Sequence, residues 1–309
     1  MILDRRPRIL IIATVVFAFL PLFSAVGFGQ ITVGKRSGAV SGAAAEIRTL
    51  TFASRLMGRE MSFRVVLPPG YDRPKEAPER YATIYLLHGL FGHFDNWTDK
   101  TKLAEHANAY RFILVTPEGG DGWYTDSNST PNGKYESYIV QDLIPEIDKR
   151  FRTTADREHR FIAGLSMGGY GAVKFGLKYR DMFSLVGSFS GALDSPIRGQ
   201  ENKTLRPSIM NVFGPEDTQL RKDNDVFRLL RGVPAEAIKE LPYIYLACGT
   251  EDFLFEANRE FDALLLEKNV PHEYRELPGG HEWPFWEAQV REFMRIADKR
   301  LTTEAKKTT

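Results

Sequence analysis

The chain has few of the residues from which metal sites and disulfides are built. It contains one cysteine, Cys248, and six histidines among 309 residues. One cysteine excludes an internal disulfide, and no Cys/His cluster has the spacing of a zinc site. The segment 223–225, Asp-Asn-Asp, lacks the glycine and the distant glutamate of an EF-hand loop. We therefore expect no metal, and we interpret Cys248 as a small buried hydrophobic residue.

An excess of charge of either sign is also missing. The sequence has 41 Lys and Arg residues against 40 Asp and Glu residues, a net charge of +1. Nothing in this balance indicates nucleic acid or an anionic membrane as the main partner. Internal repeats and domain-scale shifts in composition are absent too. The composition therefore predicts one globular domain. Without the N-terminal segment described next, this domain has about 280 residues and can bury about three quarters of its unfolded surface.

Long apolar runs are rare, and the one from Ile9 to Phe23 lies near the N-terminus. Three arginines precede this run, and small residues with the spacing of a cleavage site follow it, directly before Gln30. This layout predicts a secretory signal peptide over residues 1–29 and an exported protein, periplasmic or extracellular. Its removal would take away three arginines and one aspartate, and the net charge would become −1. Pro21 interrupts the run, so we expect no stable membrane span after cleavage, although an uncleaved anchor remains the alternative.

The remaining chain divides into a lead-in, a domain and a tail. Residues 30–47 are small and polar and predict a linker, whereas 302–309 predict a polar tail. Between them, residues 48–301 show two alternating segments that predict a hairpin, followed by apolar runs that alternate with amphipathic helices. This order is typical of an α/β domain with about eight strands, mostly parallel, and helices on both faces. Residues 192–241 carry several prolines and charges and predict a cap-like insertion.

Individual elements can be assigned from the same patterns. Strands are expected over Arg48–Ser54, Met61–Leu67, Ala82–Leu87, Arg111–Thr116, Arg160–Leu165, Met182–Ser190, Tyr243–Cys248 and His272–Leu277. Helices are expected over Tyr135–Phe151, Tyr170–Tyr179, Leu254–Lys268 and Glu282–Leu301.

One short segment carries the chemistry most clearly, namely Gly164-Leu165-Ser166-Met167-Gly168-Gly169. It follows an apolar strand pattern and precedes a helical one. A G-x-S-x-G sequence in this context is typical of a nucleophile elbow, in which a strained turn presents the serine. Glycine is required beside such a turn because a Cβ would clash. The sequence therefore predicts Ser166 as a nucleophile, with the backbone N–H of Met167 facing a developing oxyanion.

A serine nucleophile needs a base and an orienting carboxylate, which in this fold class follow it in the order acid, then histidine. Glu251 and Asp252 both lie in the loop after the strand 243–248, and we prefer Asp252 from its motif position. Either residue could also serve as an acid at the start of the next helix. His281 follows two glycines after the last strand and is the one histidine with both the right order and a loop setting. We therefore expect it to be the base.

A second oxyanion donor is expected from the turn after an earlier strand. The turn His88-Gly89-Leu90-Phe91-Gly92 has this position, and we assign the N–H of Leu90. His88 is interpreted as a structural hydrogen-bonding residue. Several aromatic residues near the expected cleft could bind an aromatic acyl group or a sugar ring, although core packing or loop anchoring is the more common role for any one such residue. These candidates for substrate binding are Phe91, Trp97, Trp123, Tyr124, Phe253 and Trp283.

These segments together resemble one family. The chain is similar to the esterase D-like, or putative esterase, family of the α/β-hydrolase superfamily over roughly residues 48–300. The similarity rests on the segments 86–92, 117–126, 138–145, 164–169, 249–252 and 280–281, in that order. It is strongest to the branch of tributyrin, feruloyl and acetyl-xylan esterases. It implies Ser166, Asp252 and His281 as the triad, Leu90 and Met167 as oxyanion donors, no cofactor, and acyl transfer to water through an acyl-enzyme.

The expected function is therefore that of a secreted serine carboxylesterase acting on short-chain acyl or carbohydrate-linked esters, such as feruloyl or acetyl esters. The signal peptide argues against a cytosolic glutathione-ester role, and the insertion 192–241 prevents assignment of an acyl pocket by analogy. The sequence leaves two alternative functions open. An acyltransferase would use the same triad to acylate a sugar or lipid alcohol, and a non-catalytic protein on this fold could bind glycans. Oligomeric state is not predicted.

Overall fold

An eight-stranded sheet forms the centre of the domain, with the strand order β1-β2-β4-β3-β5-β6-β7-β8. The computed structural model describes residues 44–74 and 79–307; the expected signal peptide and most of the expected linker lie outside them. The strands are β1 (Glu46–Ser54), β2 (Arg59–Leu67), β3 (Ala82–Leu87), β4 (Phe112–Pro117), β5 (Arg160–Leu165), β6 (Leu185–Phe189), β7 (Tyr243–Gly249) and β8 (His272–Leu277). The expected sheet of about eight strands is confirmed.

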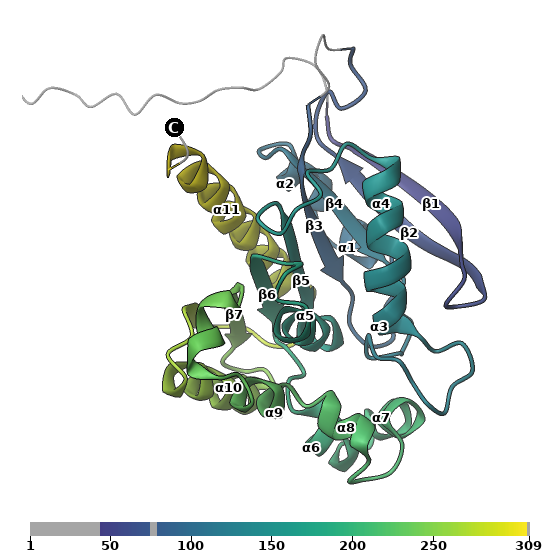
Figure 1. Ribbon diagram of the computed structural model, residues 1–309, viewed down its shortest axis with the longest axis vertical. Coiled ribbons are helices and arrows are strands. Elements are labelled where there is room, and N and C mark those ends of the chain that lie inside the picture. The colour runs from purple at the N-terminus through teal and green to yellow at the C-terminus, as the bar shows by residue number, and fades with distance from the viewer. Residues whose placement is uncertain (1–43, 75–78, 308–309) are drawn as a thin grey trace, which may run out of the picture. The chain divides into compact units, whose positions relative to one another are not determined.

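Strand direction follows from the connections. β1 and β2 form the expected antiparallel hairpin, in which Gly58 takes the positive φ of 62° that the tight turn needs. β2 also pairs antiparallel with β4, and all pairs from β4 to β8 are parallel. Parallel neighbours need crossover connections, and helices supply them between most of these strands (Figure 1). The carboxyl ends of β3 to β8 therefore lie along one edge of the sheet.

Helices cover both faces of the sheet because both faces are apolar. Along β3, Ile84 and Leu86 belong to one buried cluster, while Tyr85 and Leu87 belong to the other. The helices are α1 (Asn96–Asp99), α2 (Leu103–Ala107), α3 (Tyr135–Ser137), α4 (Ile144–Arg150), α5 (Met167–Lys178), α6 (Ser195–Arg198), α7 (Arg206–Phe213), α8 (Gln219–Asp223), α9 (Val226–Arg231), α10 (Phe255–Glu267) and α11 (Trp283–Lys307). Residues of α1, α2 and α11 pack on the first face, and residues of α4, α5, α9 and α10 on the second.

Three elements differ from the expected boundaries. β6 begins at Leu185 instead of Met182, because Met182 forms a turn in which its N–H donates to the carbonyl of Tyr179 at 3.0 Å. The expected helix 135–151 is divided by a π-helix over Tyr138–Leu143, directly before Pro145. Proline has no N–H to donate to the preceding turn, which favours a wider turn there. α11 continues to Lys307, so residues 302–307, expected as a tail, are helical.

The expected insertion 192–241 consists of short helices in the structure. It contains α6 to α9 and 3₁₀-helices over Gly199–Glu201 and Ala235–Glu240, and it lies between β6 and β7. Thr218 and Asp225 cap α8 and α9 by accepting backbone N–H groups. In Figure 1 these helices gather together at the lower end of the sheet. This places extra surface beside the strand edge without extending the sheet.

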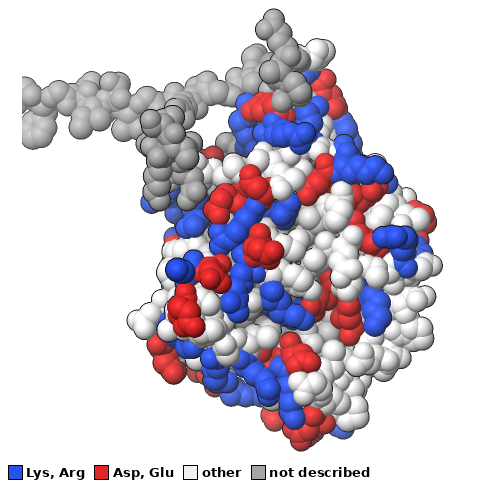
Figure 2. Space-filling model, viewed as in Figure 1, with Lys and Arg blue, Asp and Glu red and all other residues white. Residues whose placement is uncertain are grey.

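The surface carries charges of both signs. Figure 2 shows basic and acidic side chains interspersed over the face in view, with uncharged areas between them. This agrees with the net charge of +1. No helix within residues 44–74 and 79–307 is long and apolar enough to cross a bilayer.

Candidate active site

Ser166 occupies the turn between β5 and α5, as the sequence predicts. Its φ of 53° and ψ of −118° lie in a region that residues with a Cβ rarely adopt. The turn is possible because glycine lies on both sides of it. A Cβ on Gly164 would come within 2.4 Å of the backbone of Gly168, and a Cβ on Gly168 within 2.4 Å of the carbonyl oxygen of Leu87. The strained turn therefore holds the serine at the carboxyl end of the central strand.

The turn after β3 lies directly against this elbow. A Cβ on Gly89 would be 3.3 Å from the Cβ of Ser166, so the two turns are in contact. The backbone N–H groups of Leu90 and Met167 accompany these turns, and no hydrogen bond to an acceptor within the described residues engages either of them. Two unpaired N–H groups beside a serine form the kind of site that stabilises an oxyanion. The turns that carry Leu90 and Met167 thus lie against each other, and the role of the two N–H groups as oxyanion donors stays a prediction.

His88 is a structural residue in this turn. Its side chain is buried, and its Nε2 accepts the N–H of Gly119 at 2.8 Å. The proton is therefore on Nδ1, which donates to the carbonyl of Gly89 at 2.8 Å. The hydroxyl of Tyr124 donates to the carbonyl of His88 at 3.0 Å and also holds this turn in place. Both imidazole nitrogens are occupied, so His88 has none left to act as a base.

His281 and Asp252 meet at the far end of the same strand edge. His281 Nδ1 lies 2.9 Å from Oδ2 and 3.1 Å from Oδ1 of Asp252. An ionised carboxylate only accepts, so Nδ1 carries the proton and Nε2 has a free lone pair. Glu251, the competing acid, is exposed and does not contact the imidazole by any hydrogen bond among the described residues. Among the described residues, no hydrogen bond joins Ser166 to His281. Catalytic contacts between a nucleophile and its base commonly tighten when substrate binds.

The environment of Asp252 favours its ionised form. Burial by itself would raise the pKa of this carboxyl, which is 4% exposed. The hydrogen bond from His281, the backbone N–H of Leu254 at 2.9 Å and the Ser190 hydroxyl outweigh burial and lower the pKa below its ordinary value. A carboxylate held in this state can orient an imidazole and stabilise its cation.

Two aromatic rings hold the imidazole in place: Trp286, which the sequence did not single out, and Phe253, which was predicted to bind substrate. The ring of His281 lies between Phe253, at a centroid distance of 4.7 Å, and Trp286, at 4.9 Å and nearly perpendicular. Trp286 is buried, and its Nε1 donates to Ser190 Oγ at 3.2 Å. Asp121 is a further residue that the sequence did not single out, and its Oδ1 accepts the N–H of Phe91 at 2.8 Å and so fixes the turn of Leu90. Only spatial contact identifies Trp286 and Asp121, since their sequence patterns are ordinary.

The aromatic residues predicted to bind substrate divide into two groups. Phe91 and Phe253 are 65% and 62% exposed, and Trp283 is half-buried. Trp97, Trp123 and Tyr124 are fully buried, so their prediction as substrate contacts is wrong. These rings can be buried because each polar atom has a hydrogen-bond partner. Trp97 donates to the carbonyl of Leu87, Trp123 donates to Ser208 Oγ, and the hydroxyl of Tyr124 donates to the carbonyl of His88.

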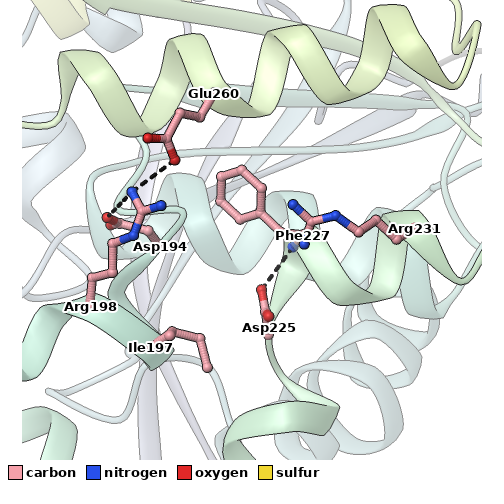
Figure 3. Close-up of a pocket in the computed structure, with 7 residues that line it drawn as sticks. All are labelled: Asp194, Ile197, Arg198, Asp225, Phe227, Arg231 and Glu260. Carbon is pink, nitrogen blue, oxygen red and sulfur yellow. Dashed lines mark hydrogen bonds and ion pairs between the residues drawn. The ribbon is translucent and has the colours of Figure 1, made fainter.

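A pocket of about 140 Å³ lies away from the triad residues, between α6, α9 and α10 (Figure 3). Arg198 pairs there with Glu260 at 2.8 Å, and Asp225 accepts the N–H of Phe227 at 3.0 Å. Burial raises the pKa of Asp194, which also lines this pocket. The ion pair between Arg198 and Glu260 joins the insertion to α10. We therefore interpret this pocket as part of the contact between the insertion and α10.

The described residues contain no group of three or more His, Cys, Asp or Glu side chains arranged to hold a metal ion. In the segment 223–225, Asp225 caps α9 and Asn224 is buried, where it accepts a hydrogen bond from Lys174 at 3.2 Å. Cys248 is buried as predicted, and burial raises the pKa of its thiol to about 12. A thiol in this state is a poor nucleophile.

Comparisons with known proteins identify the family, the fold and the class of activity. The sequence profile of the family described as putative esterase matches residues 54–295. An acetyl esterase from Caldicellulosiruptor saccharolyticus is 29% identical over 256 residues, which make up 79% of this chain and 95% of the relative. A solved ferulic acid esterase is 26% identical, with a TM-score of 0.71 over 83% of this chain and 99% of that chain. FphF, a fluorophosphonate-binding serine hydrolase of Staphylococcus aureus, has a TM-score of 0.75 at 23% identity over 82% of this chain and 98% of its own. The chain therefore belongs to the putative esterase family, has the α/β-hydrolase fold and is a carboxylic ester hydrolase.

Proposed function

We propose that this protein is an exported serine esterase that hydrolyses short-chain acyl or carbohydrate-linked esters, such as acetyl and feruloyl esters, through an acyl-enzyme. The relatives named acetyl esterase and ferulic acid esterase support this substrate class. The observation that carries the mechanism is the hydrogen bond of 2.9 Å between His281 and Asp252, at the same strand edge as the strained Ser166.

In the first half-reaction, Ser166 Oγ attacks the ester carbonyl and its proton passes to His281 Nε2. The negative charge on the carbonyl oxygen is stabilised by the N–H groups of Leu90 and Met167. When the tetrahedral intermediate collapses, the carbon–oxygen bond to the alcohol breaks and His281 gives its proton to that oxygen. Asp252 stabilises the imidazolium throughout.

In the second half-reaction, water replaces the alcohol. His281 takes a proton from the water, the water oxygen attacks the acyl carbonyl, and the carboxylic acid leaves as Ser166 regains its proton. Nothing beyond the side chains and backbone of this chain is needed for either step. No cofactor is part of the proposal.

Hydrolysis of p-nitrophenyl acetate by the purified protein and by its Ser166→Ala variant tests this mechanism. We expect Ser166→Ala to lower kcat by about 10⁴-fold or more, because the nucleophile is lost while binding remains. Ser62→Ala, on the opening hairpin, is the matched control and should keep the activity of the original protein. Equal rates for all three proteins would contradict the role of Ser166.

Counting both products separates hydrolysis from acyl transfer. In the presence of an acceptor alcohol, a hydrolase should release acetic acid and p-nitrophenol in equal amounts. An excess of p-nitrophenol over acid, together with an acylated acceptor, would show instead that the acyl-enzyme is consumed by transfer.

A further inference from the structure

The turn that follows β6 lies between the nucleophile and the acid of the proposed triad. It consists of residues 190–192, Ser-Gly-Ala. β6 is hydrogen-bonded to β5, which leads to Ser166, and to β7, which leads to Asp252. Because these three strands are parallel, their carboxyl ends meet at one edge of the sheet. A group in this turn therefore has the nucleophile on one side and the loop of the acid on the other.

The backbone at this end of β6 holds the nucleophile by two hydrogen bonds. The N–H of Ser166 donates to the carbonyl of Phe189 at 2.9 Å, and the carbonyl of Ser166 accepts the N–H of Ala192 at 3.0 Å. The N–H of Ser190, between them, donates to the carbonyl of Ala247 in β7 at 2.8 Å. The backbone position of the nucleophile therefore depends on the course of the turn, and the turn is fixed to the next strand.

Ser190 adopts a strained backbone conformation at the centre of this arrangement. Its φ is 49°, in the left-handed region that residues with a Cβ rarely occupy, and its side chain is fully buried. Glycine would take this conformation without strain. Strain of this kind persists where the surrounding structure imposes it, and it is concentrated at functional sites. A buried serine at such a position indicates that its hydroxyl is in use.

The Ser190 hydroxyl has one partner for each of its three hydrogen-bonding positions. It accepts the N–H of Trp286 Nε1 at 3.2 Å, and it also hydrogen-bonds to the carboxylate of Asp252 and to the thiol of Cys248. Burial raises the pKa of the thiol to about 12, so the thiol keeps its proton. An ionised carboxylate only accepts, so the hydroxyl donates to Asp252 and receives the protons of the indole and the thiol.

These contacts give the hydroxyl two connections to the base. Through Asp252, it reaches the carboxylate that accepts Nδ1 of His281 at 2.9 Å. Through Trp286, it reaches the ring that meets the imidazole nearly edge-on at 4.9 Å. Within the described part of the chain, the titratable groups that face Asp252 are His281 and the neutral Cys248. The hydroxyl and the imidazole therefore share the negative charge of the carboxylate.

We propose that Ser190 is a positioning residue of the active site, whose hydroxyl holds Asp252 in place for His281 while the backbone of its turn holds Ser166. The inference rests on the proposed esterase function and adds a residue that acts through the acid and the base without touching the substrate. Loss of the hydroxyl leaves the charge of Asp252 to the imidazole alone, so His281 takes up its proton at a higher pH.

Two variants separate the hydroxyl from the strained backbone. Ser190→Ala removes the hydroxyl and keeps the strain, whereas Ser190→Gly removes the hydroxyl and relieves the strain. We expect both to lower kcat for p-nitrophenyl acetate by about 10-fold or more, because a small displacement of the acid and the base slows proton transfer. Full kcat in Ser190→Gly would overturn the proposal, since the hydroxyl would then be dispensable.

Ser184→Ala is the matched control. Ser184 directly precedes β6, at the end of the strand away from the active site. It is also buried, and its hydroxyl donates to the carbonyl of Glu158 at 3.2 Å. Its replacement removes a buried serine hydroxyl from the same part of the sheet and should leave kcat unchanged.

The pH profile supplies a measurement that a loss of packing would not change. The acid limb of kcat/KM records protonation of the base. We expect this limb to move upward by about 0.5 pH unit or more in Ser190→Ala and Ser190→Gly, because the carboxylate then stabilises the imidazolium more strongly. Ser184→Ala should keep the limb of the unaltered protein. An unchanged acid limb in both Ser190 variants would overturn the proposal.

An NMR titration of the imidazole of His281 separates this proposal from the esterase mechanism. In the Ser166→Ala background it needs no turnover. We expect His281 to titrate at a higher pH when Ser190→Ala is added to this background, and at the same pH when Ser184→Ala is added. Equal titration in all three proteins would refute the role of Ser190 even if Ser166 proves to be the nucleophile. A shift without any ester hydrolysis by the unaltered protein would leave the contact of Ser190 with the acid standing while the mechanism fails.

Discussion

At the scale of single residues, the position of His281 depends on three different kinds of contact. Asp252 binds Nδ1, Phe253 covers one side of the ring, and Trp286 meets it nearly edge-on. Phe253 is mostly exposed, whereas Trp286 is buried and anchored to Ser190. The buried contact is the more rigid of the two, so we expect Trp286 to act as the positioning residue for the base.

Truncation of Trp286 tests this role. We expect Trp286→Ala to lower kcat for p-nitrophenyl acetate by about 10- to 100-fold, because a small displacement of the imidazole spoils proton transfer. KM should change by less than about 3-fold, since Trp286 is buried away from the substrate. Because loss of a buried tryptophan also costs about 3–5 kcal/mol of stability, rates must be measured well below the melting temperature of each variant.

Trp286→Phe is the matched control for this experiment. It keeps a ring against His281 and removes only the hydrogen bond to Ser190, so its kcat should lie between those of the unaltered protein and Trp286→Ala. Full activity of Trp286→Ala would show that Asp252 and Phe253 suffice to hold the imidazole.

At the scale of elements, helix α5 is fixed by a buried ion pair behind the nucleophile. Lys174 is fully buried, and its Nζ lies 2.9 Å from Glu136 Oε2. The same Nζ donates to the carbonyl of Tyr124 and to Thr125 Oγ1, both at 2.6 Å. Burial lowers the pKa of Lys174 to about 8, although Glu136 opposes this change. The pair joins the helix that begins behind Ser166 to α3 and to the loop after β4.

The Glu136 carboxylate makes this network sensitive to acid. Burial raises its pKa, but Lys174 and Lys178 outweigh burial and lower the pKa to about 2, from 4.5. The resulting stabilisation is present above pH 4.5 and is lost as pH falls through about 2. We expect a loss on the order of 3 kcal/mol in the free energy of unfolding from this group over that range. Urea unfolding at a series of pH values measures it.

Variants of two glutamates separate the buried pair from the general effect of acid. At pH 7, Glu136→Gln should lower the free energy of unfolding by about 3 kcal/mol, because it leaves the buried Lys174 without its carboxylate. The difference from the unaltered protein should shrink as the pH approaches 2. Glu146→Gln removes a salt bridge to Arg150 nearer the surface and should cost less than about 1 kcal/mol. A difference that stays constant with pH would contradict the pKa direction of Glu136.

At the scale of the whole molecule, the question is where the enzyme works. The sequence of residues 1–29 predicts a secretory signal, and we propose that the domain is exported after cleavage before Gln30. Expression of the full chain in a Gram-negative host, followed by N-terminal sequencing of the periplasmic protein, should give Gln30 as the first residue. A chain that lacks residues 1–29 should remain in the cytoplasm. An intact N-terminus in the membrane fraction would favour the uncleaved anchor.

The sequence by itself determined the features that depend on local patterns. Alternating apolar residues located the hairpin, and continuous apolar runs located most of the other strands, since a strand buried on both faces must be apolar along its length. The elbow was visible because a strained serine needs glycine within a few residues of it in the chain. The order of Ser166, Asp252 and His281 could be predicted because parallel strands bring their carboxyl ends to one edge.

Only the tertiary structure decided features that depend on contacts between distant segments. Trp97, Trp123 and Tyr124 are fully buried whereas Phe91 and Phe253 are exposed, and sequence cannot tell which rings find a buried hydrogen-bond partner. The sequence preferred Asp252 to Glu251 as the partner of His281 without excluding Glu251, and the structure shows that Asp252 makes the contact, across 29 residues. Helix α7 of the insertion packs on the loop after β4, where the carbonyl of Asn211 accepts the hydroxyl of Ser127 at 3.3 Å. Chain folding joins these segments, and no local periodicity encodes that contact.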